Sequence, residues 1–200
     1  PEDYIPPKNV RRMERFTQFS VACSKMLLED AGWEIPEEDQ DRVGCIMGCG
    51  LGGLEALERA HTHLMNKGPR RVTPFMIPTL ISNMAPGMIS MFIKAKGPNF
   101  VCTSACASGI HGIGTAYTDI LLDRADAVVT GGVESTITAM AVGGFNALKA
   151  LSTHNDEPQR ASRPFDKDRD GFVMGEGCGM MLLETLEHAR IYADLFRANA

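Results

Sequence analysis

Residues 99–132, "NFVCTSACASGIHGIGTAYTDILLDRADAVVTGG", decide the fold of this 200-residue chain. The first five residues have the pattern of a strand, small residues follow, and the pattern of a buried helix starts near residue 107. A second strand pattern, "DAVVTGG", closes the stretch. Strands separated by helices imply a layered α/β fold.

The same alternation continues on both sides of this stretch. "DRVGCIMGCG" and "GCGMMLLE" have strand patterns, while "LEALERAHTHLMNKG" and "TLEHAR" have helical ones. The Met-rich segment "NMAPGMISMFIKAKGP" predicts a helix whose start is weakened by Pro86 and Gly87. "NVRRMERFTQFSVACSKMLLEDAG" predicts one helix that ends at Gly32. The apolar face of this helix contains Val10, Met13, Phe16, Val21 and Leu28.

The composition is that of a soluble globular domain, or of one piece of a larger domain. Hydrophobic residues make up 44% of the chain and charged residues 22%. The net charge of −5 predicts no nucleic-acid partner, and no apolar run reaches the roughly 20 residues of a membrane helix. The first residues, "PEDYIPPKNVRRMERF", contain no signal-peptide pattern. Six cysteines without repeat spacing indicate a reducing compartment.

A glycine cluster, "GCGLGGLE", follows one predicted strand and precedes a predicted helix. Its spacing does not fit the dinucleotide-binding pattern G-x-G-x-x-G. We therefore expect these glycines to allow close backbone packing at a strand-to-helix corner rather than to hold a nucleotide.

Most of the cysteines are expected to be small buried hydrophobes: Cys23, Cys45, Cys49, Cys102 and Cys178. The C-x-x-x-C spacing of two pairs lacks the C-x-x-C form or the nearby histidines of a zinc site, so no metal is predicted.

Cys106 has a different setting, directly before a predicted helix. The unpaired N–H groups and partial positive charge of a helix N-terminus favour a thiolate, which is the reactive form of cysteine. The flanking residues of "TSACASG" are small, so a sharp turn can expose the sulfur, and a backbone N–H can donate to a developing oxyanion. These features alone leave a nucleophile and an inert thiol equally open.

Several separated motifs resemble the elongating type II β-ketoacyl-acyl carrier protein synthases over nearly the whole chain. They are "GCGLGGLE", "GPRRVTPFMIP", "NMAPGMISMFIKAKGPN", "TSACASGIHGIG", "ADAVVTGGVES", "VGGFNALKALST" and "SRPFDKDRDGFVMGEGCG". The resemblance implies the thiolase fold, in which two similar halves form α-β-α-β-α layers. Residues 1–200 would be an incomplete synthase domain, namely the N-terminal half and the start of the second half, with both ends incomplete.

The resemblance also implies a reaction. Cys106 falls where the family has its acyl-accepting cysteine, so the expected activity is the decarboxylative condensation of acyl groups with malonyl-acyl carrier protein in fatty acid elongation. The family's catalytic histidines lie in H-G-T and G-H motifs, with a lysine between them, and this chain has neither motif; the piece alone is expected to be inactive. Two alternatives are a non-catalytic or heterodimeric ketosynthase-like subunit and a thiolase-like coenzyme A acyltransferase.

Other positions carry implied or expected roles. By resemblance, Leu51, Met76 and Phe145 gate or line the acyl pocket, with ordinary core packing as the alternative. His111 is expected to pack rather than act as a base, because helical spacing turns it about 140° from the nucleophile. In "PFDKDRDG", the carboxylates and Arg169 predict a salt-bridged loop; the acidic members are Asp166, Asp168 and Asp170.

The implied partner is an acidic acyl carrier protein, in its acyl and malonyl forms. A basic rim could steer it electrostatically, and solvated helix faces are the alternative. The resemblance further implies a homodimer without cofactor, located in the cytoplasm or, alternatively, in a plastid or the mitochondrial matrix. The rim consists of Lys8, Arg11, Arg12, Arg70, Arg71 and Lys149.

Overall fold

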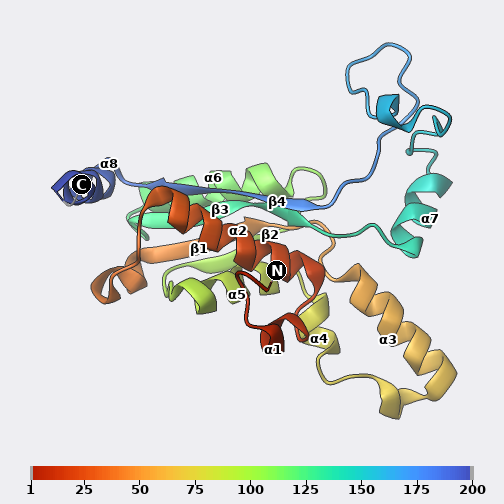
Figure 1. The fold of residues 1–200 in the computed structure, drawn as a ribbon, viewed down its shortest axis with the longest axis horizontal. Helices are drawn as coiled ribbons and strands as arrows, with labels where there is room; N and C mark the ends of the chain where they lie inside the picture. Colours follow the sequence, from red (N-terminus) through yellow and green to blue (C-terminus); the bar gives the residue numbers. More distant parts are fainter. Residues whose placement is uncertain (1, 199–200) are drawn as a thin grey trace.

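The computed structural model describes residues 2–198, and the strands within them form one mixed sheet (Figure 1). The strand order is β2-β1-β3-β4, with β2, β1 and β3 parallel and β4 antiparallel to β3 at the edge. Each strand lies where its sequence pattern predicted it. The bounds are Val43–Gly48 for β1, Asn99–Cys102 for β2, Ala127–Glu134 for β3 and Gly177–Glu184 for β4.

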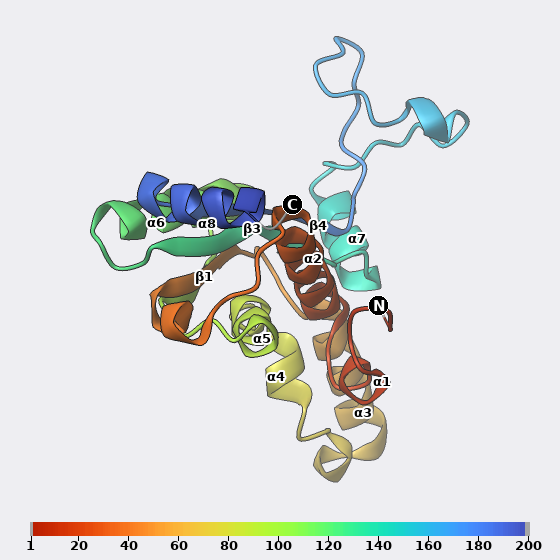
Figure 2. The same ribbon diagram turned by 60° about the vertical axis from the view of Figure 1, so that its left-hand side comes forward.

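Helices cover both faces of this sheet. Helix α6 (Ser108–Leu121) packs on β1 and β3 from one side, while α2 (Arg15–Ala31) and α5 (Met84–Ile93) pack on the other (Figure 2). Successive residues of a strand point to opposite faces, so Met47 joins the core under α2 and α5 and Ile46 joins the smaller core under α6. The layered α/β prediction is confirmed, and the described residues supply three layers.

Helix α8 (Leu186–Ala198) packs Tyr192 against the core under α2 and α5. The other helices are α1 (Pro7–Val10), α3 (Leu54–Lys67), α4 (Met76–Leu80) and α7 (Ala139–Ala147). Short 3-10 turns cover Glu37–Arg42, Pro69–Arg71 and Pro158–Arg160. No helix among the described residues combines the length and apolarity needed to cross a membrane.

The prediction of one continuous N-terminal helix is wrong. Helix α1 ends at Val10 and α2 begins at Arg15, after an extended Glu14, so Val10 and Met13 precede the apolar face of α2. The Gln18 side chain donates hydrogen bonds to the carbonyls of Val10 and Met13, which a continuous helix would bond through its backbone. The predicted end at Gly32 is confirmed, with this glycine in the left-handed conformation at φ 59°.

Helix α6 is also less buried than expected. Its sheet-facing side is made of small residues, and the backbones come so close that a Cβ atom on Gly48 would overlap the backbone of Ser108. Its opposite side is open: Ile110 and Leu121 are each about two-thirds exposed, at 66% and 65%. The helical period therefore places one apolar stripe on the sheet and leaves another uncovered.

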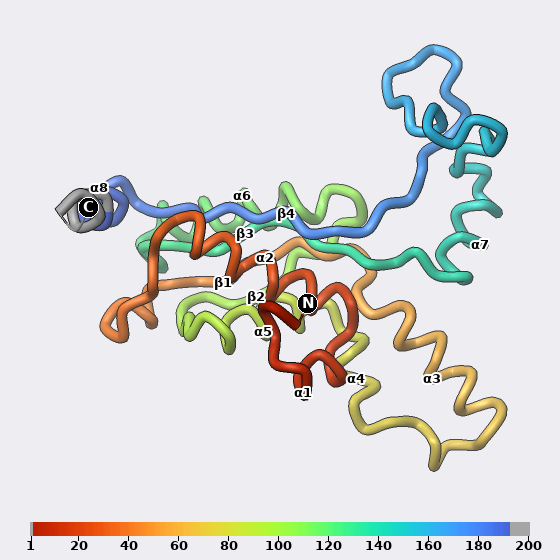
Figure 3. The backbone as a smooth tube through the Cα atoms, in the orientation of Figure 1, coloured from red at the N-terminus to blue at the C-terminus, as the bar shows by residue number. Residues whose placement is uncertain are grey.

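Two long excursions leave the sheet at the same end (Figure 3). One follows β1 and contains α3 and α4, and the other follows β3 and contains α7. This end carries the carboxyl ends of the three parallel strands, where α/β proteins place their ligand sites. The turn that contains Cys106 follows β2 at the same end.

Candidate active site

Cys106 lies in a tight turn between β2 and α6. Ala105 has a φ of 50°, a left-handed conformation that costs a non-glycine residue about 1 kcal/mol. The hydroxyl of Ser108 holds this turn, since it accepts from the N–H of Ser104 at 2.9 Å and donates to the carbonyl of Ala105 at 2.6 Å. The turn leaves Cys106 exposed just before the helix N-terminus.

Cys45 and Cys49 are buried, as expected, and burial raises the pKa of each thiol to about 12. Both therefore stay protonated and unreactive near neutral pH. Cys102 is half-buried, with its sulfur 3.5 Å from Thr115 Oγ1.

The expected full burial is wrong for Cys102 and also for Cys23 and Cys178. Cys23 on α2 and Cys178 on the edge strand β4 are only half-buried, because no further strand covers that edge among the described residues. The Cys23 thiol donates to the Cys178 carbonyl at 3.8 Å, and the neighbouring Cys178 thiol lowers the pKa of Cys23 to about 7. Cys106 remains the exposed cysteine among the six.

His111 does not pack in the core, so that expectation is wrong. It is exposed on the first turns of α6, where its Nδ1 lies 2.6 Å from Ser104 Oγ. The bond joins the end of the strand to the helix across the Cys106 turn. The angle between His111 and Cys106 on an ideal helix gives no sign of this partner, because Ser104 lies before the helix.

The glycine cluster forms a pocket of backbone N–H groups that is already filled. Glu134, the last residue of β3, accepts hydrogen bonds from the N–H groups of Gly50, Leu51 and Gly52 at 3.0, 2.8 and 3.0 Å. Such consecutive N–H groups bind anions, and here the protein's own carboxylate is the anion. The expectation against a nucleotide site agrees with this arrangement. Sequence analysis missed Glu134, although it stands within the quoted motif "ADAVVTGGVES".

The close backbone packing predicted for the glycine cluster is confirmed at Gly53. A Cβ atom on Gly53 would overlap the carbonyl oxygen of Thr79, and the N–H of Gly53 donates to the carbonyl of Leu80 at 2.9 Å. The glycine turn therefore rests directly on the end of α4, the helix that begins with Met76.

The structure brings the Leu51 turn beside the Cys106 turn. Thr103 Oγ1 donates to the carbonyl of Cys49 at 2.9 Å, and a Cβ atom on Gly50 would lie 3.7 Å from the carbonyl oxygen of Ala105. Leu51 itself is 52% exposed at the tip of its turn. Phe145 lies on the other excursion, where its ring packs edge-on against Phe172 with 5.1 Å between the centroids.

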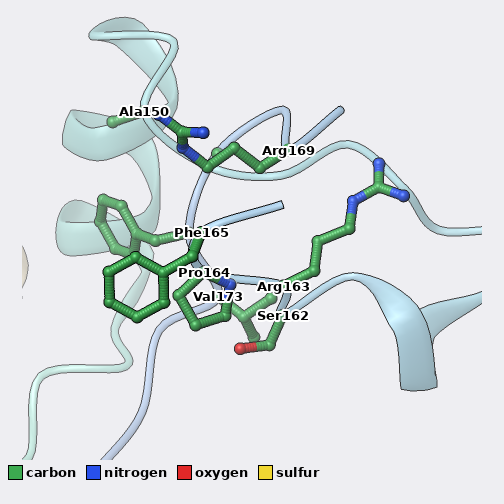
Figure 4. A pocket seen from close by; sticks show the side chains of 9 residues that line it. Ala150, Ser162, Arg163, Pro164, Phe165, Arg169 and Val173 are labelled. Atoms are coloured by element: carbon green, nitrogen blue, oxygen red, sulfur yellow. The ribbon is translucent and has the colours of Figure 1, made fainter. Parts of the chain in front are cut away.

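The loop of the second excursion surrounds a concavity of about 800 Å³ (Figure 4). Neither Cys106 nor Leu51 lines it; Phe172, the ring partner of Phe145, does. The lining residues are Ala150, Ser162, Arg163, Pro164, Phe165, Arg169, Gly171, Phe172 and Val173.

The predicted salt-bridged loop is confirmed, but the arginine in the ion pair is Arg163 and not Arg169. Asp170 accepts from the hydroxyl of Ser152 at 2.7 Å and from the N–H of Thr153 at 2.8 Å, and it pairs with Arg163 at 3.8 Å. Arg169 instead donates to the backbone carbonyl of Asp166, whose carboxylate accepts the N–H of Asp168. Within the described part of the chain, no cluster of side chains fits a metal ion.

All six predicted carrier-binding residues are exposed. The guanidinium of Arg12 lies 5.5 Å from the ring centre of Phe75, which joins the N-terminal basic group to the excursion that carries Arg70 and Arg71. Lys149 lies apart from this group, directly after α7.

Residues 2–189 match the family model described as "Beta-ketoacyl synthase, N-terminal domain", and the chain belongs to this family. A 3-oxoacyl-[acyl-carrier-protein] synthase 2 of Vibrio cholerae is 48% identical over 199 residues, which cover 97% of this chain and 48% of that protein. The chain thus spans about half the length of the curated relatives it matches.

Solved structures agree on the fold. A β-ketoacyl synthase from Burkholderia phymatum is 36% identical, with a TM-score of 0.86, and the match covers 96% of this chain and 47% of that one. A second solved structure, a type II PKS acyl-carrier protein in complex with its ketosynthase, is 26% identical, with a TM-score of 0.84. The match covers 90% of this chain and 46% of that one. The fold is therefore the thiolase fold of the ketosynthases.

Proposed function

We propose that the protein is a 3-oxoacyl-acyl carrier protein synthase that condenses acyl groups with malonyl-acyl carrier protein in fatty acid elongation. The observation that carries this proposal is the exposed Cys106, held on a strained turn at a helix N-terminus. The chain is 48% identical to proteins named for this activity, and its nucleophile position holds a cysteine. A cysteine there favours a condensing enzyme over a non-catalytic subunit.

The chemistry begins with acyl transfer. The Cys106 thiolate attacks the carbonyl carbon of the carrier thioester, and the bond between that carbon and the carrier sulfur breaks. The carrier leaves as its thiolate, which takes up a proton in place of the one that the Cys106 thiol lost. The negative charge that develops on the carbonyl oxygen needs nearby N–H donors. Within residues 2–198, no protein acceptor is bonded to the Cys106 N–H, which supports its use as one such donor.

The second half of the reaction joins two carbon atoms. Malonyl-carrier loses CO₂, its α-carbon attacks the acyl-cysteine carbonyl, and the Cys106 sulfur leaves as a thiolate. The family resemblance implies two histidine motifs for decarboxylation and oxyanion stabilisation, and residues 1–200 contain neither. We assign to this chain the acyl-accepting step and the walls around it.

Those walls include Leu51, Met76 and Phe145 as the proposed lining and gate of the acyl pocket. The contact between the Leu51 turn and the Cys106 turn supports the role of Leu51. The packing of the Leu51 turn on the end of α4, which begins with Met76, supports the role of Met76. The described ring contact of Phe145 is with Phe172 on the same excursion.

The proposed carrier surface is the basic rim, whose N-terminal part is joined to the excursion with Arg70 and Arg71 through Arg12 and Phe75. A relative whose solved structure holds an acyl-carrier protein with its ketosynthase supports this partner class. We further propose a homodimer, which the family resemblance implies, and a location in the cytoplasm, in line with the bacterial source of the similar synthases.

The test is acylation of the full-length protein by an acyl-carrier thioester, followed by mass spectrometry of its peptides. The acyl mass is expected on the peptide with Cys106 and is expected to be absent in Cys106→Ser. An adduct on Cys102 instead would overturn the assignment. Release of CO₂ from malonyl-carrier by the acylated enzyme distinguishes condensation from thiolase-like transfer to coenzyme A, and no adduct at all would favour a non-catalytic subunit.

A further inference from the structure

Glu134 holds the Leu51 turn, one of the two turns that the proposed reaction uses. It ends β3, whereas the Leu51 turn follows β1 and the Cys106 turn follows β2, the strand on the other side of β1. The pairing of Gly48 with Gly132 places the Glu134 carboxylate beside the start of the Leu51 turn. Three backbone N–H groups of that turn converge on its two oxygens at 2.8–3.0 Å.

The charge of Glu134 has no cationic partner in the described part of the chain. No Lys, Arg or His side chain there lies within 4.0 Å of this carboxylate, which is half-buried. The N–H dipoles of residues 50–52 therefore stabilise it. The carboxylate in return stabilises the turn. Leu51 stands between Gly50 and Gly52, whose backbones are conformationally free, so the hydrogen bonds to Glu134 fix the conformation of the turn.

The Leu51 turn also contacts the turn that carries the proposed nucleophile, Cys106. The backbone carbonyl of Cys49 accepts a hydrogen bond from the hydroxyl of Thr103, which lies three residues before Cys106. Gly50 lies beside the carbonyl of Ala105. A shift of the Leu51 turn would thus change the distance between Leu51 and the acyl group on Cys106. No other described side chain bonds to the N–H groups of residues 50–52.

We propose that Glu134 is a positioning residue that sets acyl-chain selectivity by holding the Leu51 turn against the Cys106 turn. The inference rests on the proposed function, since it assumes that Cys106 is acylated and that Leu51 meets the chain. Glu134 does not touch the reacting atoms and acts through Leu51. Its loss affects the choice among chain lengths more than the chemical step.

Glu134→Gln tests this with little change in shape. The glutamine keeps one oxygen acceptor, but its NH₂ group cannot accept, so at least one N–H of the turn loses its partner. Glu157→Gln is the matched control, because Glu157 is exposed and pairs with Arg160 on the second excursion. Both variants are made in the full-length protein, and thermal unfolding is compared with that of the parent.

The measured quantity is the ratio of kcat/KM for Cys106 acylation by dodecanoyl-carrier and by butyryl-carrier. Glu134→Gln is expected to change this ratio by about threefold or more, within the range that pocket contacts discriminate. Leu51→Ala is expected to change it as well. If Glu134 acts through Leu51, adding Glu134→Gln to Leu51→Ala causes little further change, because coupled residues are not additive.

The outcomes separate the inference from the proposed function. A parent protein that is not acylated on Cys106 would remove the proposed function itself. A parent that is acylated, with a ratio unmoved by Glu134→Gln or with fully additive effects of the two substitutions, would overturn the positioning role alone. The same holds if Glu157→Gln shifts the ratio as much as Glu134→Gln.

Discussion

Ser104 Oγ and His111 Nδ1 lie 2.6 Å apart, on opposite sides of the turn that carries Cys106. Ser104 follows the strand and His111 lies on the helix, so their hydrogen bond links the two ends of the turn. The hydroxyl of Ser108 adds hydrogen bonds to the backbone of the turn itself. The turn that carries the proposed nucleophile is therefore held by three hydrogen bonds.

His111→Ala is expected to slow acylation of Cys106 by about 2- to 10-fold, the effect of losing one hydrogen bond of about 0.5–1.5 kcal/mol. Ser104→Ala should give a similar loss, and the double variant little more than either alone. Single-turnover acylation measures all three. A loss above about a thousandfold for His111→Ala, with a changed pH profile, would instead make His111 a base.

Leu51→Phe is expected to reduce acylation by medium and long acyl chains more than by short ones. The larger ring would occupy space beside the Cys106 turn that a long chain needs. The comparison is a series of kcat/KM values over chain length. Leu64→Phe on the exposed side of α3 is the control and should leave the series unchanged. An equal loss at every length would indicate packing damage.

Replacing Arg70 and Arg71 by Glu is expected to raise the KM for acyl-carrier substrates and to leave a small pantetheine thioester unaffected. The steering should weaken with salt, since the Debye length is about 8 Å at physiological ionic strength. Lys94 and Lys96, exposed between α5 and β2, are the control pair for the same charge reversal. If both substrates suffer equally, the arginines support structure and not recognition.

Asp170 makes the loop of the second excursion sensitive to acid. The Ser152 hydroxyl, then the Thr153 N–H, lower its pKa to about 2 from an ordinary value near 3.8. A lowered folded-state pKa means that the contribution to stability is complete above about 4 and is lost as the pH falls towards 2. The difference in Tm between the parent and Asp170→Asn should thus be constant above about pH 4 and shrink below it. A constant gap down to pH 2 would contradict this.

Gly53→Ala is expected to destabilise the protein by about 1–3 kcal/mol, because the new methyl group would overlap the carbonyl of Thr79 and neither backbone can move freely. Gly143→Ala provides the contrast. This glycine is inside α7, and apart from its chain neighbours and the backbone of α7 no atom lies within 4 Å of the position that a new methyl group would take. Alanine should therefore stabilise the protein by up to about 1 kcal/mol. Urea unfolding of both variants gives the comparison.

The sequence alone was sufficient for the local elements and for the position of Cys106 on a turn just before a helix. Alternating or continuous apolar patterns predicted β1, β2, β3 and β4, and glycines marked the ends of α2 and α3. The small residues around Cys106 predicted its sharp turn. These features are local, because side-chain periodicity and glycine conformation depend on residues a few positions apart.

The partners of the polar residues were decided only by the tertiary structure. Glu134 bonds to a turn more than 80 residues earlier, Arg163 rather than Arg169 pairs with Asp170, and Gln18 replaces the backbone where α1 and α2 separate. A hydrogen bond or ion pair needs its atoms within about 3–4 Å, and strand order brings such atoms together. Patterns along the chain describe what a residue can donate or accept, and the packing of β1 between β2 and β3 determines which group it meets.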